Sequence, residues 1–232
     1  MLILISLIVF FRCSYLLLKD CYEFEENNQA TEVLIEENIV IDNDTNEVSI
    51  DWKNLKAINP DIIGWIEIEN TNINYPILKD DDSLFYLKHT FDRTYNSNGS
   101  IFTTDSSPFE SEETTIYGHN MKNGSMFSDL EKYLNKEFLN SHLSIRIYTP
   151  NCNYEGEIFS VYSIGIETEN DNIKNLDFNE RINYYKNASK YSIENNVECC
   201  RILKLSTCSY INATTRPTNQ RYYIIANLIP IK

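Results

Sequence analysis

Apolar residues fill the first part of the chain almost without interruption. Leu2–Phe11 contains no charged residue, and the apolar run resumes after Arg12 and continues to Leu18. About seventeen mainly apolar residues lie near the lower limit for a helix that spans a bilayer. No basic segment precedes the run and no small-residue cleavage motif follows it, which argues against a cleaved signal peptide. We therefore expect residues 1–19 to form an N-terminal membrane anchor, with a buried core helix as the alternative.

The segment that follows is polar and acidic. No Lys or Arg occurs from Asp20 to Asp51, whereas ten acidic residues fall between Asp20 and Glu47. A segment with charges of one sign and few aromatic residues is typical of solvated spacers. The pattern predicts an acidic spacer over residues 20–49 and a folded domain over residues 50–232.

The rest of the chain alternates apolar and polar residues in short stretches that are typical of strands. The predicted strands are 63–69, 73–78, 100–104, 114–117, 144–148, 157–166, 200–205 and 222–229. Apolar residues at helical spacing predict helices over 51–58, 82–88, 127–138 and 177–191. The last of these helices lies inside a polar insertion at 167–196 that precedes one of the strands. Many strands with few helices predict a mainly β fold, a barrel or sandwich with peripheral helices.

Composition narrows the functional classes. The chain has 232 residues, of which 42% are hydrophobic, and a formal net charge of −14 with a pI near 4.6. This length suits one sizeable domain with appendages. Because an acidic protein has few groups to neutralise phosphates, we expect no nucleic-acid partner.

Two predicted strands end in residues that can perform nucleophilic chemistry. The strand 114–117 is followed by Gly118 and His119, and a second strand ends at Cys208; Arg221 opens the final strand. If the last two strands pair as an antiparallel hairpin, Cys208 and Arg221 lie at the same end of the sheet. A thiolate is the nucleophilic form of cysteine, a nearby histidine can exchange its proton, and a guanidinium can stabilise the thiolate or an oxyanion. Each residue alone is more often structural, so the hypothesis rests on their joint occurrence.

These segments resemble the functional motifs of sortases. Tyr117–Met121 is similar to the family's histidine segment, Leu205–Cys208 to its cysteine segment, and Arg221 with the following aromatic residues to its arginine segment. Three further stretches resemble the framework of the class B branch. They are Gly64–Ile66, Tyr75–Ile77 and Gly99–Phe102. The resemblance covers about Asp51 to Ile229 and the motifs occur in the family's order.

The resemblance implies an eight-stranded sortase-type β-barrel with peripheral helices, N-terminal helices and a helix-containing insertion before the cysteine strand. It implies a transpeptidase in which Cys208 attacks the Thr carbonyl of a sorting signal, and His119 serves as general acid and base. Arg221 would hold the oxyanion with the backbone N–H of Ser209, while Ser206 and Thr207 would line the substrate groove. We expect no cofactor and no metal.

The implied partners are surface proteins with a C-terminal sorting signal, often of the Asn-Pro-x-Thr type, and a peptidoglycan-precursor or pilin amine as acceptor. The implied location is the cell membrane of a Gram-positive bacterium, with the catalytic domain extracellular. Two alternatives remain open. One is a cysteine peptidase in which water resolves the thioester, and the other is a surface-binding module that has lost catalysis.

Overall fold

The computed structural model describes residues 2–42, 48–193, 201–210 and 218–231. The chain divides into two compact units, residues 1–58 and 59–232. The division falls after the helix that follows the acidic segment. The domain boundary predicted at residue 50 stays a prediction.

The first unit is mostly helical. Its elements are α1 (Leu2–Asn38), β1 (Ile39–Ile41), β2 (Val48–Ile50) and α2 (Trp52–Ile58). The Asn54 side chain donates to Asn38 Oδ1 over 2.8 Å, which links α2 to the end of α1. The Asp51 carboxylate accepts from the Asn54 backbone N–H at 2.9 Å and caps α2. The acidic segment is thus helical as far as Asn38, its role as a spacer stays a prediction, and the helix predicted over 51–58 is present.

The expectation of a membrane anchor at the N-terminus differs from what the structure shows. In the described stretches of the chain, no helix combines the length and the apolar character needed to cross a bilayer. The single-pass membrane anchor predicted over residues 1–19 is therefore not supported.

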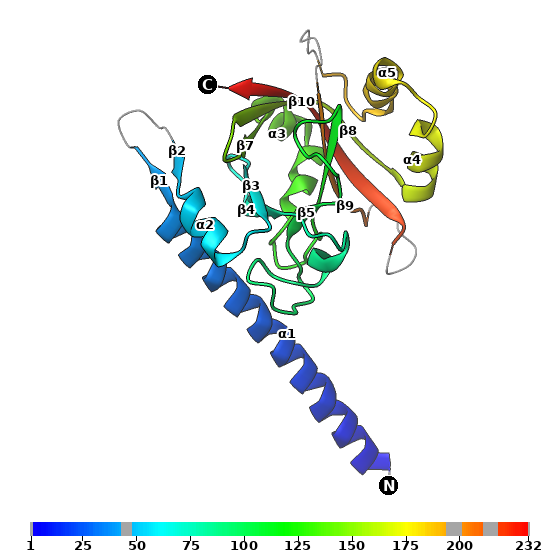
Figure 1. Ribbon diagram of the computed structural model, residues 1–232. Coiled ribbons are helices and arrows are strands. Elements are labelled where there is room, and N and C mark those ends of the chain that lie inside the picture. The colour runs from blue at the N-terminus through cyan, green and yellow to red at the C-terminus, as the bar shows by residue number, and fades with distance from the viewer. Residues whose placement is uncertain (1, 43–47, 194–200, 211–217, 232) are drawn as a thin grey trace. The chain divides into compact units, whose positions relative to one another are not determined.

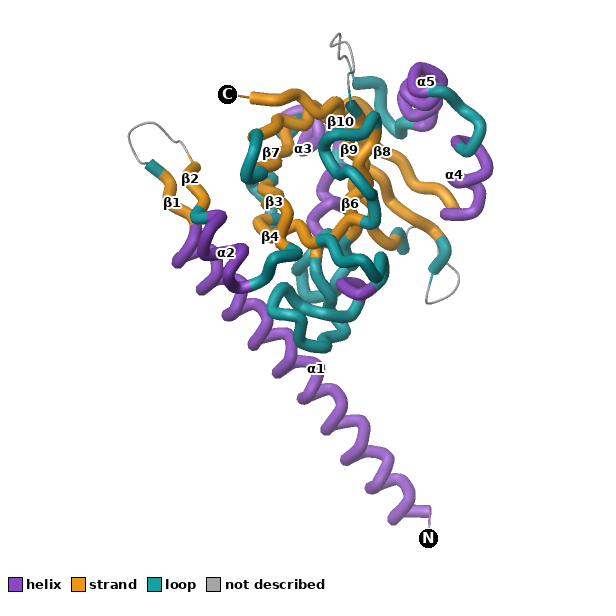
Figure 2. Tube along the Cα trace, viewed as in Figure 1, coloured by secondary structure: helices purple, strands orange, loops and turns teal. Residues whose placement is uncertain are grey.

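The second unit is a closed barrel, visible as the ring of strands in Figures 1 and 2. Within the described ranges its eight strands follow the order β10-β8-β7-β3-β4-β5-β6-β9. They are β3 (Ile62–Glu67), β4 (Asn74–Leu78), β5 (Ile101–Thr103), β6 (Glu113–Tyr117), β7 (Ser144–Tyr148), β8 (Asn153–Gly165), β9 (Ile202–Cys208) and β10 (Gln220–Ile231). The mainly β class and the eight-stranded barrel with peripheral helices are confirmed.

The directions of the strands determine which strand ends meet at one rim of the barrel. Most neighbouring strands are antiparallel, but β6 and β9 run parallel, with Tyr117 opposite Ser206. β9 and β10 are antiparallel, as the hairpin argument required. The carboxyl ends of β6 and β9 and the amino end of β10 therefore meet at one rim of the barrel.

Short helices lie in the connections. They are the 3₁₀ helices η1 (Phe85–Leu87) and η2 (Ser128–Leu134), followed by α3 (Lys136–Ser141). The single helix predicted over 127–138 is thus split at Asn135, whose extended backbone and side-chain bond to Phe138 N begin α3 as a new helix. The helix expected over 82–88 is only a 3₁₀ turn.

The insertion before β9 packs on the outside of the barrel. It contains α4 (Ile166–Ile173) and α5 (Phe178–Ala188), the second of which begins with a capping box formed by Asp177 and Glu180. An apolar cluster joins α5 to β8, β9 and β10, separately from the barrel interior. Its buried members are Phe159, Tyr162, Ile182, Tyr185, Ile202, Tyr223 and Ile225. The outer face of these three strands is therefore covered, which makes β9 buried on both of its faces.

Candidate active site

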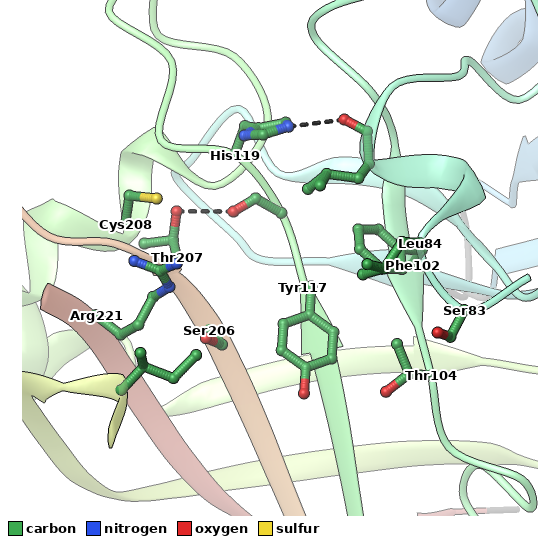
Figure 3. Close-up of a pocket in the computed structure, with 13 residues that line it drawn as sticks. Ser83, Leu84, Phe102, Thr104, Tyr117, His119, Ser206, Thr207, Cys208 and Arg221 are labelled. Atoms are coloured by element: carbon green, nitrogen blue, oxygen red, sulfur yellow. Dashed lines mark hydrogen bonds between the residues drawn. The ribbon is translucent and has the colours of Figure 1, made fainter. Parts of the chain in front are cut away.

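The three predicted catalytic residues meet at one rim of the barrel. β6 ends at Tyr117, so His119 leaves the barrel beside the end of β9, where Cys208 lies. Arg221 on β10 is the direct register partner of Cys208. Side chains of facing residues in an antiparallel pair lie on the same face with Cβ atoms about 5 Å apart. The parallel and antiparallel pairings together bring the histidine, thiol and guanidinium to one place (Figure 3).

All three residues line a cavity of about 540 Å³. Its walls combine apolar side chains with hydroxyl groups. The remaining lining residues are Ser83, Leu84, Leu87, Phe102, Thr104, Tyr117, Gly118, Ile166, Ser206 and Thr207. Sequence reasoning found Ser206 and Thr207 but missed the other walls. Leu84 precedes η1 and Leu87 ends it, in a segment that was predicted as a short helix, and Ile166 opens a helix that was not predicted.

Cys208 is the last residue of β9 and carries a free, half-buried thiol. The strand end beneath it is tied to β6 by two hydrogen bonds. Thr207 Oγ1 donates to the Gly118 carbonyl over 2.8 Å, and the Gly118 N–H donates to the Ser206 carbonyl over 3.2 Å. The hydroxyl of Thr207 therefore holds the histidine segment in place, in addition to its position in the cavity wall.

His119 is oriented by its neighbours in the chain and across the cavity. Its Nε2 lies 2.9 Å from the Leu87 carbonyl oxygen. Because a carbonyl oxygen only accepts, Nε2 must carry a hydrogen, and Nδ1 is the nitrogen left to exchange a proton. Figure 3 shows the hydrogen-bonded edge of the His119 ring turned away from Cys208. The backbone just before His119 has no room for a side chain, because a Cβ at Gly118 would lie 2.5 Å from Ile101 Cδ1.

Asn120 is a site residue that the sequence analysis missed. Its side-chain Nδ2 donates to the Cys208 carbonyl over 2.8 Å and to Glu131 Oε1 over 2.7 Å. The residue after the histidine is thus bonded directly to the backbone of the nucleophile. Its position in the sequence gave no signal of this contact, which depends on the parallel pairing of β6 and β9.

Replacement of Asn120 tests the importance of this bond. We expect Asn120→Ala to lower kcat by about 10- to 100-fold with little change in KM, because small displacements of reacting groups cost rate. Asn120→Asp should cost more, since it places a carboxylate against a carbonyl oxygen and against Glu131. Lys122→Ala, an exposed change in the same loop, is the control. Wild-type kcat in a folded Asn120→Ala enzyme would show that the bond has no positioning role.

Arg221 is half-buried and is held by the loop that precedes β10. One terminal nitrogen donates to the carbonyls of Thr218 and Gln220, each over 3.0 Å. These bonds fix the direction of the guanidinium, which Figure 3 shows beside Thr207 and Cys208. The competing candidate Arg216 lies outside the described residues.

Ser209 does not occupy the predicted place. It is buried, is not part of the cavity wall, and its backbone N–H donates to the Gln220 carbonyl over 3.0 Å. A role for this N–H as an oxyanion donor would require that ladder bond to break. Continuation of the β9–β10 ladder by one pair is the physical reason for the difference.

The phenol of Tyr117, which also lines the cavity, does not compete for the proton transfer. Burial raises the pKa of Tyr117 above its ordinary value, and the charge of Asp105 acts in the same direction. The phenol therefore stays protonated at neutral pH.

In the described part of the chain, no three His, Cys, Asp or Glu side chains are grouped as metal ligands. The absence of a metal stays a prediction.

Comparison with known proteins gives consistent similarities. The sortase domain family matches residues 66–229. The chain is 40% identical over 172 residues to sortase B of Listeria monocytogenes, covering 70% of this chain and 68% of that protein. It is 31% identical over 189 residues to sortase B of Staphylococcus aureus, covering 78% and 75% of the two chains. The crystal structure of Clostridium perfringens sortase B superposes with a TM-score of 0.68 at 31% identity, covering 76% of this chain and 98% of that one.

Proposed function

The chain belongs to the sortase family and is a class B enzyme, a cysteine transpeptidase of the cell-wall anchoring kind, and from this premise we propose how its residues carry out the reaction. The observation that carries the proposal is the register pairing of Cys208 with Arg221 beside His119 in one cavity. Its substrates are surface proteins that bear a sorting signal, as the family implies.

The first half-reaction forms an acyl-enzyme. The Cys208 thiolate attacks the carbonyl carbon of the Thr in the sorting signal and forms a C–S bond. As the tetrahedral intermediate collapses, the peptide bond after Thr breaks and its nitrogen takes a proton from His119 Nδ1. The product is a thioester on Cys208 and a free amine on the released C-terminal segment.

Arg221 stabilises the charge that develops on the carbonyl oxygen. The guanidinium is a permanent cation with several donors, and the bonds to Thr218 and Gln220 orient it before substrate arrives. Donors that need no reorganisation at the moment of reaction are the most effective stabilisers of an oxyanion.

The second half-reaction reverses the proton movement. The amine of a peptidoglycan precursor attacks the thioester carbonyl, His119 Nδ1 accepts its proton, and the Cys208 thiolate leaves. A new amide bond then joins the surface protein to the cell wall. A pilin lysine as acceptor would follow the same steps.

The apolar side of the cavity suits the peptide chain of the sorting signal. Leu84, Leu87, Phe102 and Ile166 supply contact area, and Ser206 and Thr207 border the nucleophile. Ligand sites commonly combine apolar walls with a few placed polar groups. We propose that these side chains bind the residues preceding the scissile Thr.

Sortases are cell-surface enzymes, and we propose that the apolar first half of α1 holds this one at the membrane. Several large apolar side chains in this half are more than half exposed, among them Ile3, Phe10, Phe11 and Leu18. A helix that exposes such side chains gains free energy by burying them at a lipid interface.

The function is tested by incubating the full-length protein with Asn-Pro-x-Thr-type peptides and a glycine-based amine. We expect the Thr–amine conjugate to increase with amine concentration while hydrolysed peptide decreases. Hydrolysed peptide alone at high amine concentration would establish the peptidase alternative. No turnover, together with a Cys208 thiol that a methanethiosulfonate reagent labels only after unfolding, would establish the inert binding module.

A further inference from the structure

A buried ion pair joins the insertion to the strand that carries the nucleophile, and the mechanism makes no use of it. Lys204 Nζ on β9 lies 2.6 Å from Glu169 Oε1 on α4. The two residues are only 4% and 1% exposed. Tyr162 donates to the same carboxylate over 2.6 Å and Tyr184 donates over 2.9 Å.

Two tyrosine rings lie against the ammonium of Lys204. The Lys204 ammonium lies 4.5 Å from the centre of the Tyr223 ring and 5.0 Å from that of Tyr185. Removing two charges from water is costly, and apolar replacements of such pairs are often as stable. Stability alone is therefore a weak reason for this arrangement, and its position in the fold suggests another.

Lys204 belongs to the row of residues that leads to the nucleophile. Successive side chains of a strand alternate between faces, so Lys204, Ser206 and Cys208 share the outer face of β9. Tyr223, whose ring contacts the ammonium, is the register partner of Ser206. The ion pair therefore lies on the same strand face as the cavity, a short way along β9.

Glu169 lies one helical turn after a cavity wall. Ile166, the first residue of α4, lines the cavity, and its N–H donates to the Asn219 carbonyl over 3.0 Å. The residues just before it, Ile164 and Gly165, pair with Arg221 and Gln220. One turn of α4 thus carries both the wall at Ile166 and the carboxylate that binds Lys204.

We propose that Glu169 and Lys204 are positioning residues that hold the first turn of α4 against the nucleophile strand and so fix the Ile166 wall of the substrate cavity. This inference rests on the proposed function. Without the pair the wall loses its fixed place, and the sorting-signal peptide binds more weakly. The reactivity of the Cys208 thiol itself does not depend on the pair.

The test compares Lys204→Met, Glu169→Gln and the double variant in the full-length protein. We expect each to raise KM for the sorting-signal peptide by at least about tenfold, with kcat within about threefold, the pattern for lost substrate binding. The rate at which a small methanethiosulfonate reagent labels Cys208 should stay unchanged. Lys174→Met, which removes the exposed ion pair with Asp171 on the same helix, is the matched control and should leave KM unchanged.

The double variant separates positioning from stability. A single variant leaves one buried charge unpaired and can unfold, whereas the double variant removes both charges. A double variant with the wild-type melting temperature and wild-type KM would overturn the proposal. Hydrogen exchange at residues 166–173 supplies a measurement that needs no turnover: we expect faster exchange there and unchanged exchange in β9. If wild-type enzyme transfers no peptide, the proposed function fails, and unchanged exchange at 166–173 overturns the positioning role independently.

Discussion

Cys208→Ala is expected to lower kcat/KM for the sorting-signal peptide by about 10⁴-fold or more, the scale for removing a nucleophile from a concerted catalytic group. No other thiol can take its place at the cavity, because Cys208 is the one cysteine among the described lining residues. His119→Ala should cost nearly as much, since the leaving amine then has no proton donor. The measurement is steady-state cleavage of a fluorogenic peptide by the full-length protein.

The double variant sharpens this prediction. When two residues act as a unit, removing either one removes their joint contribution to the rate. The double variant Cys208→Ala with His119→Ala should therefore lower kcat/KM scarcely more than either single change. Losses that multiply would mean that the two residues act independently. Thermal melts of all three variants verify that the barrel remains folded.

Arg221→Ala is expected to lower kcat/KM by at least about 10²-fold, the scale for losing an oxyanion donor. Arg221→Lys should recover little, because a point charge does not reproduce the planar guanidinium fork. The register pairing with Cys208 and the two bonds that orient the guanidinium support this expectation.

Arg216 provides the matched comparison, since it is an arginine of the same β9–β10 connection. It precedes Pro217, where extended and solvated conformations are favoured, so Arg216→Ala should cost less than about tenfold. Near-wild-type Arg221→Ala beside an inactive Arg216→Ala would transfer the catalytic role to the loop. Both variants should melt at the wild-type temperature.

Alternation of apolar residues was sufficient to predict the barrel strands, whereas the hairpin that pairs Cys208 with Arg221 entered as a condition. The condition was reasonable because the two strands are neighbours in the sequence, and the structure shows the antiparallel register that it required. The arrival of His119 beside Cys208 came from the family resemblance, since β6 and β9 are separated in the chain and pair in parallel.

Contacts between distant segments account for what the sequence did not predict. The bond from Asn120 to the Cys208 carbonyl and the bond from Ser209 N–H to Gln220 both depend on strand register beyond the last residue with an apolar pattern. The helix α4 was missed because Glu169, which is buried against Lys204, stands in the sequence among polar residues that are typical of a solvated segment.

The strand order of the barrel also separates a local pairing from a long-range one at the catalytic centre. β10 follows the other barrel strands in the chain, yet it lies between β8 and β9 and closes the ring. Arg221 meets Cys208 through the hairpin of β9 and β10, which are neighbours in the sequence, whereas His119 reaches Cys208 only through the parallel pairing of β6 with β9. Since long-range strand pairing is the slow part of folding, we expect the guanidinium to reach the thiol before the imidazole does.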